Sequence, residues 1–311
     1  VTYPHAPNIE GAGFMPGHRE SGDEHFIDYR ETAPSTATRD MYLDPAGNVI
    51  DGKSTEGHLS IGVPGTVAGM ALAHERFGLL SWGDVLSYAW ELAKDGFTVD
   101  DFLVGRINKK RDFLSTHPET KRIFIDPALE PGDTLRQPDL AHTIYRIMTE
   151  GPDDFYLGDT ADLIAAEMAR GGGQVTRINL ASYEAVYRKP VRFAYKDFEI
   201  ISAPPPSSGG LILAQMMGIF EEKEIGRLGY HTRDHVHLLA EAAKIAYRTR
   251  AVYMGDEDFL PSPIRGLGDP AYIDNLASLV ETDRVLPIDE LDAIDLSPPV
   301  SGTAGQSGAG G

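Results

Sequence analysis

The stretch that decides the fold is HFIDYRETAPSTATRDM, residues 25–41. It opens with aromatic and β-branched side chains, which favour a half-buried strand, and the chain then turns at Pro34. This pattern places Arg30 at the end of the strand. Its planar guanidinium is suited to holding a carboxylate through two parallel hydrogen bonds. The alternative, which this stretch alone favours, is a surface ion pair with Glu24 or Glu31.

The following stretch, HLSIGVPGTVAGMALAHERFG at residues 58–78, predicts a short strand, a glycine- and proline-rich turn and a helix. Thr66 and Ser81 are predicted helix caps. The spacing of apolar residues predicts helices at 66–77, 82–96, 98–117, 138–150, 160–170, 211–222 and 232–253. Strands are predicted at 183–193 and 197–202. Helices and strands together predict an α/β (α+β) fold.

Composition excludes several classes of protein. The 311 residues carry 28 basic and 47 acidic side chains, a net charge of −19, which argues against nucleic acid or an anionic membrane surface as a partner. The chain shows no apolar run long enough to span a bilayer. It has no cysteine, which excludes disulfides, zinc–thiolate sites and a cysteine nucleophile.

Two further motifs have both a structural and a functional interpretation. PPPSSGG at 204–210 predicts a rigid elbow between a strand and a helix, and a helix N-terminus there could also bind an anion. A serine nucleophile is not expected, because the G-x-S-x-G pattern is absent. His231, His235 and His237 form a histidine cluster, but only two of them share a helix face, so no metal site is expected.

The composition shifts from Leu286 onward to Asp, Pro, Ser and Gly, and the chain ends SPPVSGTAGQSGAGG. Such a stretch has little apolar area to bury against its ordering entropy. We therefore predict a folded part at residues 1–285 and a flexible linker at residues 286–311. The first residue is Val1 and not Met, which suggests a piece of a longer product.

Taken together, RETAP…ATRDM and SIGVPGTVAG resemble the γ-glutamyltransferase (γ-glutamyltranspeptidase, glutathione hydrolase) family. The resemblance continues in order from about Gly11 to about Ile273, through LAKDGF at 92–97, PGDTLRQPDLA at 131–141, GPDDFY at 151–156 and PPPSSGG. Arg30 falls where the family has the arginine that holds the α-carboxylate of the glutamyl substrate. Two positions depart from the family: its run of four glycines reads Glu10-Gly11-Ala12-Gly13, and Thr249 replaces an acidic residue.

The resemblance implies that the chain is the large-subunit half of an αββα N-terminal-nucleophile hydrolase, without the family's first segment. Its sheet would be completed by a small subunit from the same self-cleaving precursor, reached through the linker. The catalytic threonine would be the first residue of that subunit, after Gly311, with its own α-amine as the base. No catalytic residue is then expected within the chain, which alone should be inactive.

The intact enzyme would transfer the γ-glutamyl group of glutathione or related compounds to water, amino acids or peptides through a glutamyl-threonine ester. It would need no cofactor and no metal, and the family is usually periplasmic or secreted. An alternative in the same superfamily is a cephalosporin or glutaryl acylase. An alternative from another class is a non-catalytic binding or scaffold protein that keeps the fold.

Overall fold

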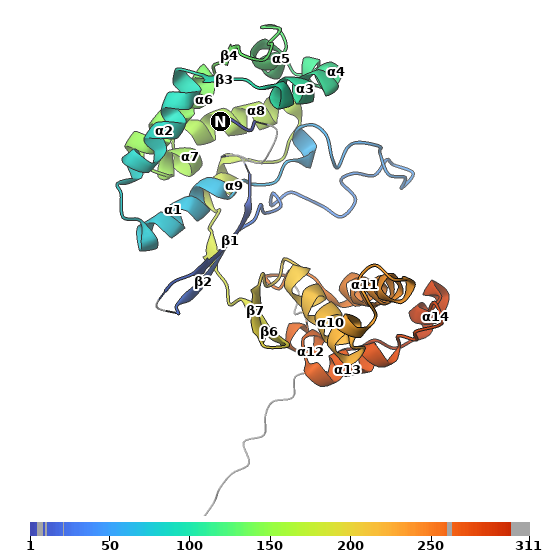
Figure 1. Ribbon diagram of the computed structural model, residues 1–311. Coiled ribbons are helices and arrows are strands. Elements are labelled where there is room, and N and C mark those ends of the chain that lie inside the picture. The colour runs from blue at the N-terminus through green and yellow to red at the C-terminus, as the bar shows by residue number, and fades with distance from the viewer. Residues whose placement is uncertain (5–8, 10, 21, 260–262, 300–311) are drawn as a thin grey trace, which may run out of the picture. The chain divides into compact units, whose positions relative to one another are not determined.

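The computed structural model describes residues 1–4, 9, 11–20, 22–259 and 263–299. The contacts divide the chain into two compact units. Unit 1 comprises Val1–Met15 and Ile27–Tyr187, and unit 2 comprises Pro16–Phe26 and Arg188–Gly311 (Figure 1). The chain is thus a mixed α/β protein, as predicted, but its folded part is two units where the sequence suggested one.

Unit 1 is built mainly of helices that bury their apolar faces against one another. Helices α2 (Trp82–Lys94) and α6 (Pro138–Glu150) run side by side, with Ala93, Ala141 and Ile144 buried in their contact (Figure 1). A second core includes Val67, Ile147 and Phe155, so α6 contributes to both cores. The helices of these two cores are α1 (Thr66–Phe77), α2 (Trp82–Lys94), α6 (Pro138–Glu150), α7 (Asp153–Leu157), α8 (Asp159–Gly171) and α9 (Arg177–Ala181), with the 3₁₀ turn η1 (His58–Ser60) nearby.

Local sequence explains where these helices begin. Ser81 caps α2 as predicted, since its hydroxyl oxygen accepts the N–H of Asp84 at 3.1 Å. The cap predicted at Thr66 lies one residue earlier: Thr66 is the first residue of α1, and Gly65 occupies the cap position. Pro138 is the first residue of α6, where its missing N–H has no helical partner to lose.

A smaller layer of unit 1 contains β3 (Phe97–Thr98), α3 (Asp101–Lys109), α4 (Arg111–Ser115), α5 (Pro118–Phe124) and β4 (Thr134–Leu135). The single helix predicted at 98–117 is wrong. Asp100 caps α3 through the N–H of Leu103, and the helix breaks at Lys110. The break lets α4 turn so that Leu114 packs on the same small core as Leu103 and Ile107.

The sheet that carries the predicted arginine has the strand order β1 (Gly13–His18), β2 (Glu24–Tyr29) and β5 (Val186–Tyr187). Strands β2 and β5 are antiparallel, with Ile27 opposite Tyr187. The strand predicted at 183–193 is split, because Pro190 lies between β5 and the next strand and has no N–H for a ladder.

Unit 2 packs helices on a two-stranded hairpin, β6 (Val191–Tyr195) and β7 (Phe198–Ser202). Its core brings together Leu211 and Ile219 of α10 (Gly209–Glu222) with Ile245 of α11 (Arg233–Tyr253) and Leu276 of α13 (Pro270–Ser278). Each fully buried aliphatic side chain of this kind contributes about 1.5–3 kcal/mol. The shorter elements are η2 (Ile225–Arg227), α12 (Ile264–Leu267) and α14 (Ile288–Ala293).

The prediction of a flexible linker over residues 286–299 is wrong. Leu286, Leu291 and Leu296 are buried in the core of unit 2, and α14 lies between the first and the last of them. The backbone of Leu286 is also held, since its N–H donates to Glu241 Oε2 at 3.1 Å and its carbonyl accepts from Lys244. The sequence suggested a linker because these leucines stand singly among polar residues. The rest of the predicted linker, residues 300–311, lies outside the described residues.

Candidate functional site

Arg30 follows directly after β2, in unit 1, and its backbone is fixed on both sides. Its N–H donates to Asp28 Oδ1 at 2.9 Å, and its carbonyl oxygen accepts the hydroxyl of Tyr183 at 2.8 Å. Asp28 and the neighbouring Tyr29 are buried, whereas the Arg30 side chain is about two-fifths exposed (43%). The fold therefore fixes the backbone of Arg30 and leaves its side chain partly exposed.

Two glycines, one at the N-cap of α1 and one within the helix, allow this arrangement. A Cβ at Gly65 would lie 2.0 Å from the Tyr183 hydroxyl and 2.2 Å from the Tyr29 carbonyl oxygen. A Cβ at Gly69 would lie 2.3 Å from the Tyr29 ring. Because real Cβ atoms do not approach so closely, both positions require glycine for the strand end and the helix to meet. The glycines of SIGVPGTVAG thus set the place of Arg30 in the fold.

The guanidinium of Arg30 is held by its neighbour in the sequence. Its Nε donates to Glu31 Oε2 at 3.0 Å and its Nη2 to Oε1 at 2.9 Å, while Phe14 lies 5.5 Å from it, measured to the ring centre. The hydrogen bonds from Arg30 hold the pKa of Glu31 below its usual range. Of the two predicted partners the structure places Glu31 on Arg30; Glu24 bonds instead to Arg192.

The two stretches that suggested the family lie side by side. Thr32 and Val63 form an antiparallel bridge, with N–H to O distances of 3.2 and 2.8 Å. The carbonyl oxygen of Gly11 accepts the N–H groups of Gly65 and Thr66 at the start of α1, which places Gly11 beside the same turn. Glu10 itself lies outside the described residues. Gly13, the last residue of this run, is a glycine, and a Cβ at its position would lie only 3.0 Å from the Tyr29 hydroxyl.

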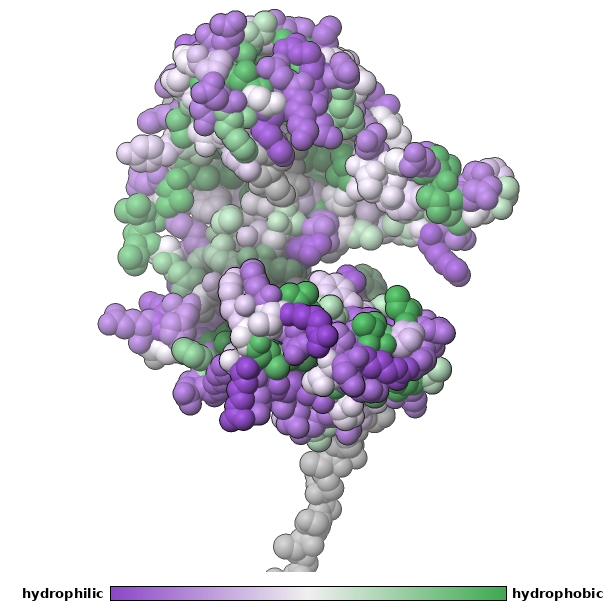
Figure 2. Space-filling model, turned by 45° about the vertical axis from the view of Figure 1, so that its right-hand side comes forward, coloured by the Kyte–Doolittle hydropathy of each residue, from purple (hydrophilic) through white to green (hydrophobic). Residues whose placement is uncertain are grey.

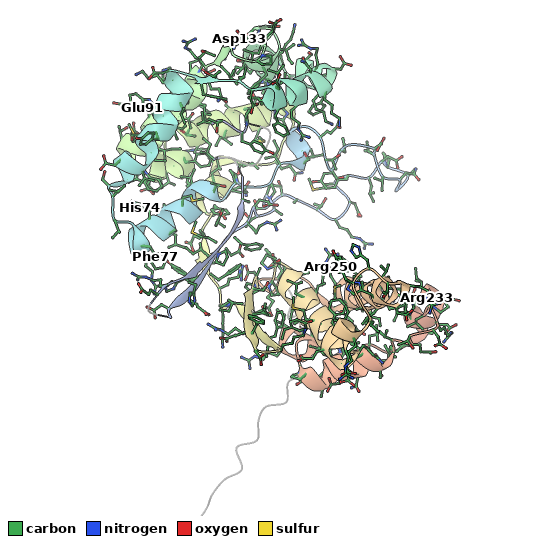
Figure 3. All side chains as sticks on the ribbon, viewed as in Figure 1. His74, Phe77, Glu91, Asp133, Arg233 and Arg250 are labelled. Atoms are coloured by element: carbon green, nitrogen blue, oxygen red, sulfur yellow. The ribbon has the colours of Figure 1, made fainter. Side chains whose placement is uncertain are left out.

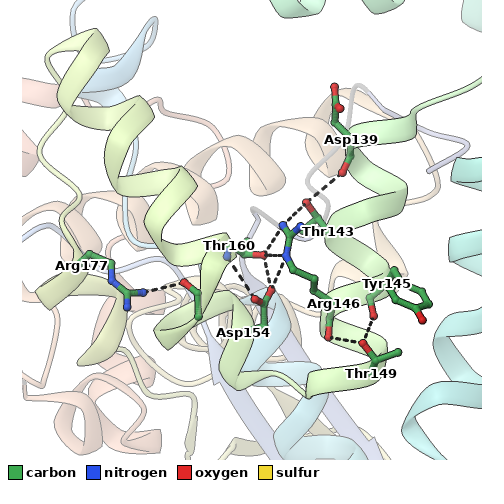
Figure 4. Close-up of polar contacts among 9 residues, drawn as sticks. Asp139, Thr143, Tyr145, Arg146, Thr149, Asp154, Thr160 and Arg177 are labelled. Atoms are coloured by element: carbon green, nitrogen blue, oxygen red, sulfur yellow. Dashed lines mark hydrogen bonds and ion pairs between the residues drawn. The ribbon is translucent and has the colours of Figure 1, made fainter.

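The GPDDFY stretch contains a buried carboxylate and a tyrosine that contacts the turn before α1. Asp154 is fully buried at its side chain; it accepts the hydroxyl of Thr160 and lies 3.5 Å from Arg146 Nε (Figure 4). Arg146 also donates to the Thr160 hydroxyl from Nη2 at 3.0 Å. Within the same stretch, the hydroxyl of Tyr156 donates to the Pro64 carbonyl at 3.0 Å, so the turn before α1 is tied to α7.

A cavity of about 730 Å³ opens beside this turn within unit 1. Tyr156 and Tyr183 stack at 5.7 Å between ring centres and form part of its wall, and burial raises the pKa of both hydroxyls. Among the described residues that line it there is no serine, threonine, cysteine or lysine.

The PPPSSGG stretch forms the predicted elbow between β7 and α10 in unit 2. Ser207 accepts the N–H of Gly209 at 3.2 Å, and Ser208 accepts Arg250 Nε at 2.9 Å. Arg250 lies on α11, as the side-chain view shows (Figure 3). A small cleft of about 270 Å³ lies at this elbow, and the two serines are engaged by the protein itself.

The histidine cluster does not gather as a metal site. The rings of His231 and His235 lie 6.3 Å apart between their centres, and His237 Nε2 contacts the Glu281 carbonyl at 2.8 Å. Throughout the described ranges, no three His, Cys, Asp or Glu side chains are placed to share a metal ion. The described helices likewise include none that is both long and apolar enough to cross a bilayer.

The chain was compared with protein families, curated proteins and solved structures. The family model described as gamma-glutamyltranspeptidase matches residues 1–306. The chain belongs to the gamma-glutamyltranspeptidase family.

Individual relatives agree with this. The chain is 40% identical over 301 residues to a glutathione hydrolase proenzyme of Escherichia coli (strain K12), covering 96% of this chain and 52% of the relative. It is 36% identical over 292 residues to the Acylase ACY 1 proenzyme of Pseudomonas sp. (strain SE83), covering 91% and 52%. The crystal structure of Helicobacter pylori gamma-glutamyltranspeptidase superposes with a TM-score of 0.90 at 36% identity, covering 100% of this chain and 87% of that chain. The chain spans about half the length of the curated relatives it matches, their N-terminal, large-subunit portion.

The structure places residues beside Arg30 that the sequence did not single out. Tyr183 was only the start of a predicted strand, yet its hydroxyl fixes the Arg30 carbonyl. Tyr156 belonged to the GPDDFY match without an assigned role. No spacing rule connects residue 183 to residue 30, so only the fold could identify this contact. The role of Arg30 toward a substrate stays a prediction.

Thr249, one of the two departures from the gamma-glutamyltranspeptidase pattern, is hydrogen-bonded to uncharged groups. Thr249 is fully buried in unit 2 and donates to Gln215 Oε1 at 2.7 Å. Gln215 in turn donates to the Leu267 carbonyl at 3.0 Å. A buried polar group must be hydrogen-bonded, and this chain of bonds satisfies the threonine without an ion pair.

Proposed function

We propose that this chain is the large-subunit part of a γ-glutamyltransferase, which cleaves glutathione and transfers its γ-glutamyl group to water, amino acids or peptides. The observation that carries the proposal is the 40% identity to a glutathione hydrolase proenzyme, over 96% of the chain. The presentation of Arg30 from a fixed strand end agrees with a carboxylate anchor.

In this proposal the helices and strands of the chain form half of an αββα sandwich, which a small subunit of the same precursor completes. That subunit supplies the threonine nucleophile after self-cleavage, and its α-amine acts as the base. The chain alone is inactive, and the enzyme requires neither cofactor nor metal. We also propose that the enzyme is exported to the periplasm or secreted.

Arg30 has the part of the substrate anchor. A γ-glutamyl donor carries one α-carboxylate, and an arginine fork binds such a group through two parallel hydrogen bonds. The binding energy is then spent at a group remote from the scissile amide, which orients the γ-carbonyl for attack. An ammonium at the same place would keep the charge and lose the two-point geometry.

The test is the full-length precursor, expressed beside residues 1–311 alone. We expect two fragments on a denaturing gel, turnover of a chromogenic γ-glutamyl anilide and of glutathione, and no turnover by residues 1–311. A precursor that stays uncut and inactive under these conditions would refute the proposal and favour a binding or scaffold protein.

A second candidate is an acylase. The 36% identity to the Acylase ACY 1 proenzyme favours it, since that relative matches the same half of the chain. Assays with a glutaryl or cephalosporin amide decide between the two. An enzyme that cleaves these amides, and leaves the γ-glutamyl anilide intact, would be an acylase; the α-carboxylate anchor at Arg30 would then have no ligand.

A further inference from the structure

The two-point carboxylate site of Arg30 is already filled from within the chain. Nε and Nη2 donate to the two carboxylate oxygens of Glu31 at 3.0 and 2.9 Å, the geometry that a free carboxylate would adopt. Phe14 lies near the guanidinium, 5.5 Å from it to the ring centre. A carboxylate that approaches Arg30 therefore meets another carboxylate on the same two donors.

Resting on the function proposed above, we propose that Glu31 is a displaceable internal ligand of Arg30. It holds the guanidinium fork in the free protein and yields it to the α-carboxylate of a γ-glutamyl donor. Glu31 is suited to move because its side chain is about 45% exposed. Its Cβ and Cγ lie against Gly62, where an added Cβ would be 3.1 Å away.

The Arg30–Glu31 ion pair is weak enough for a donor carboxylate to displace Glu31. Half-exposed ion pairs contribute from about zero to 1 kcal/mol, because water screens them and two side chains lose rotamer freedom. A donor therefore displaces Glu31 at little cost, and its apparent affinity is lower by at most about five-fold. Asp28 and Tyr183 also lie beside Arg30, and each is hydrogen-bonded to its backbone. Both oxygens of the Glu31 carboxylate accept from the fork.

If Glu31 instead positioned Arg30 permanently, removing its charge would change donor binding in the opposite direction. If the pair held Arg30 in the orientation that a donor needs, loss of the Glu31 charge would weaken donor binding. If Glu31 competes with the donor, loss of the charge strengthens donor binding. The sign of the change in KM therefore separates the two roles, whatever its size.

The experiment measures donor kinetics of Glu31→Gln in the processed full-length enzyme with a chromogenic γ-glutamyl anilide. Glu31→Gln keeps the shape of the side chain and removes its charge. We expect KM to fall about two- to five-fold, with kcat unchanged because the fork is occupied by donor at saturation in both enzymes. Glu91→Gln is the control, because it removes one exposed carboxylate from another element, α2 (Figure 3 labels Glu91).

A KM that rises or stays the same in Glu31→Gln would overturn the inference, and so would an equal fall in Glu91→Gln, which would reflect net charge alone. The same substitution made in Arg30→Ala should have no effect, since the contested fork is gone. Arg30→Ala by itself separates this inference from the proposed function. If Arg30→Ala is impaired and Glu31→Gln does not lower KM, only the competition is refuted; if Arg30→Ala behaves like the wild type, the anchor and the competition both fail.

Discussion

Leu291→Ala tests the part of the fold that the sequence misjudged. Leu291 lies on α14 with 1% of its surface exposed, in the core that α11 and α13 share. Truncating a buried leucine typically costs about 2–5 kcal/mol, from the lost transfer free energy and the cavity left behind. Because α14 is only six residues long and can settle inward, we expect a loss near the lower end, about 2–3 kcal/mol.

The matched control is Ile288→Ala on the same helix. Ile288 is 68% exposed, so its truncation should change stability by less than about 0.5 kcal/mol. Both variants remove aliphatic carbon from α14, and only one of them removes it from the core. A difference between them therefore measures burial and not helix propensity.

The assay must report on unit 2. The chain has two tryptophans, Trp82 and Trp90, and both lie in unit 1, so tryptophan fluorescence would follow the wrong unit. Hydrogen exchange of peptides from α11 and α13, read by mass spectrometry, follows the opening of unit 2 directly. A loss of 2–3 kcal/mol corresponds to roughly 30- to 150-fold faster exchange in Leu291→Ala. Equal exchange in the two variants would mean that residues 286–299 are not part of the core.

Two further variants test the packing of α1 against Tyr29 and the ion pair between Glu167 and Arg170 on α8. Gly69→Ala places a Cβ 2.3 Å from the Tyr29 ring and should lower the free energy of unfolding in urea by about 1–3 kcal/mol. The control is Gly105→Ala on α3, where a Cβ meets open space, and this variant should be neutral or stabilising. Equal effects of the two substitutions would contradict the close approach of Gly69 to Tyr29. The pKa of Glu167 is lowered to about 2, above all by Arg170, from an ordinary value of 4.5. Its contribution is therefore present above pH 4.5 and is lost as the pH falls toward 2. Glu167→Gln should cost less than about 1 kcal/mol at pH 7 in urea titrations. The difference should shrink steadily as the pH is lowered toward 2, and a difference that stays constant over that range would refute the assignment.

The sequence predicted elements well where a local rule acts alone. Ser81 marks the start of α2, Pro138 marks the start of α6, and the long apolar pattern of α11 needs no help from its neighbours. The sequence-based prediction failed where contacts between distant residues determine the structure. The break at Lys110 serves a small core built from several short elements, and Leu291 is buried by helices far away in the sequence.

The sequence likewise predicted part of the candidate site and missed the part that depends on distant contacts. Arg30 could be singled out from its place in RETAP, and the sequence also named Glu31 as one of two possible partners. The choice between Glu31 and Glu24 depended on Arg192, which takes Glu24 from across 168 residues. The support from Tyr183 required the packing of Tyr29 against Gly65, a contact with no signature in spacing or composition.

The central claim is that Arg30 anchors a γ-glutamyl donor, and the kinetics of the processed Arg30→Ala enzyme test it most directly. Removing one partner of a desolvated charge pair costs about 2–5 kcal/mol, so kcat/KM for the γ-glutamyl anilide should fall roughly 30- to 5,000-fold. Arg30→Lys should recover only part of this loss. Self-cleavage should proceed in both variants, since it does not involve the donor. A processed Arg30→Ala enzyme with near-wild-type kcat/KM would contradict the account.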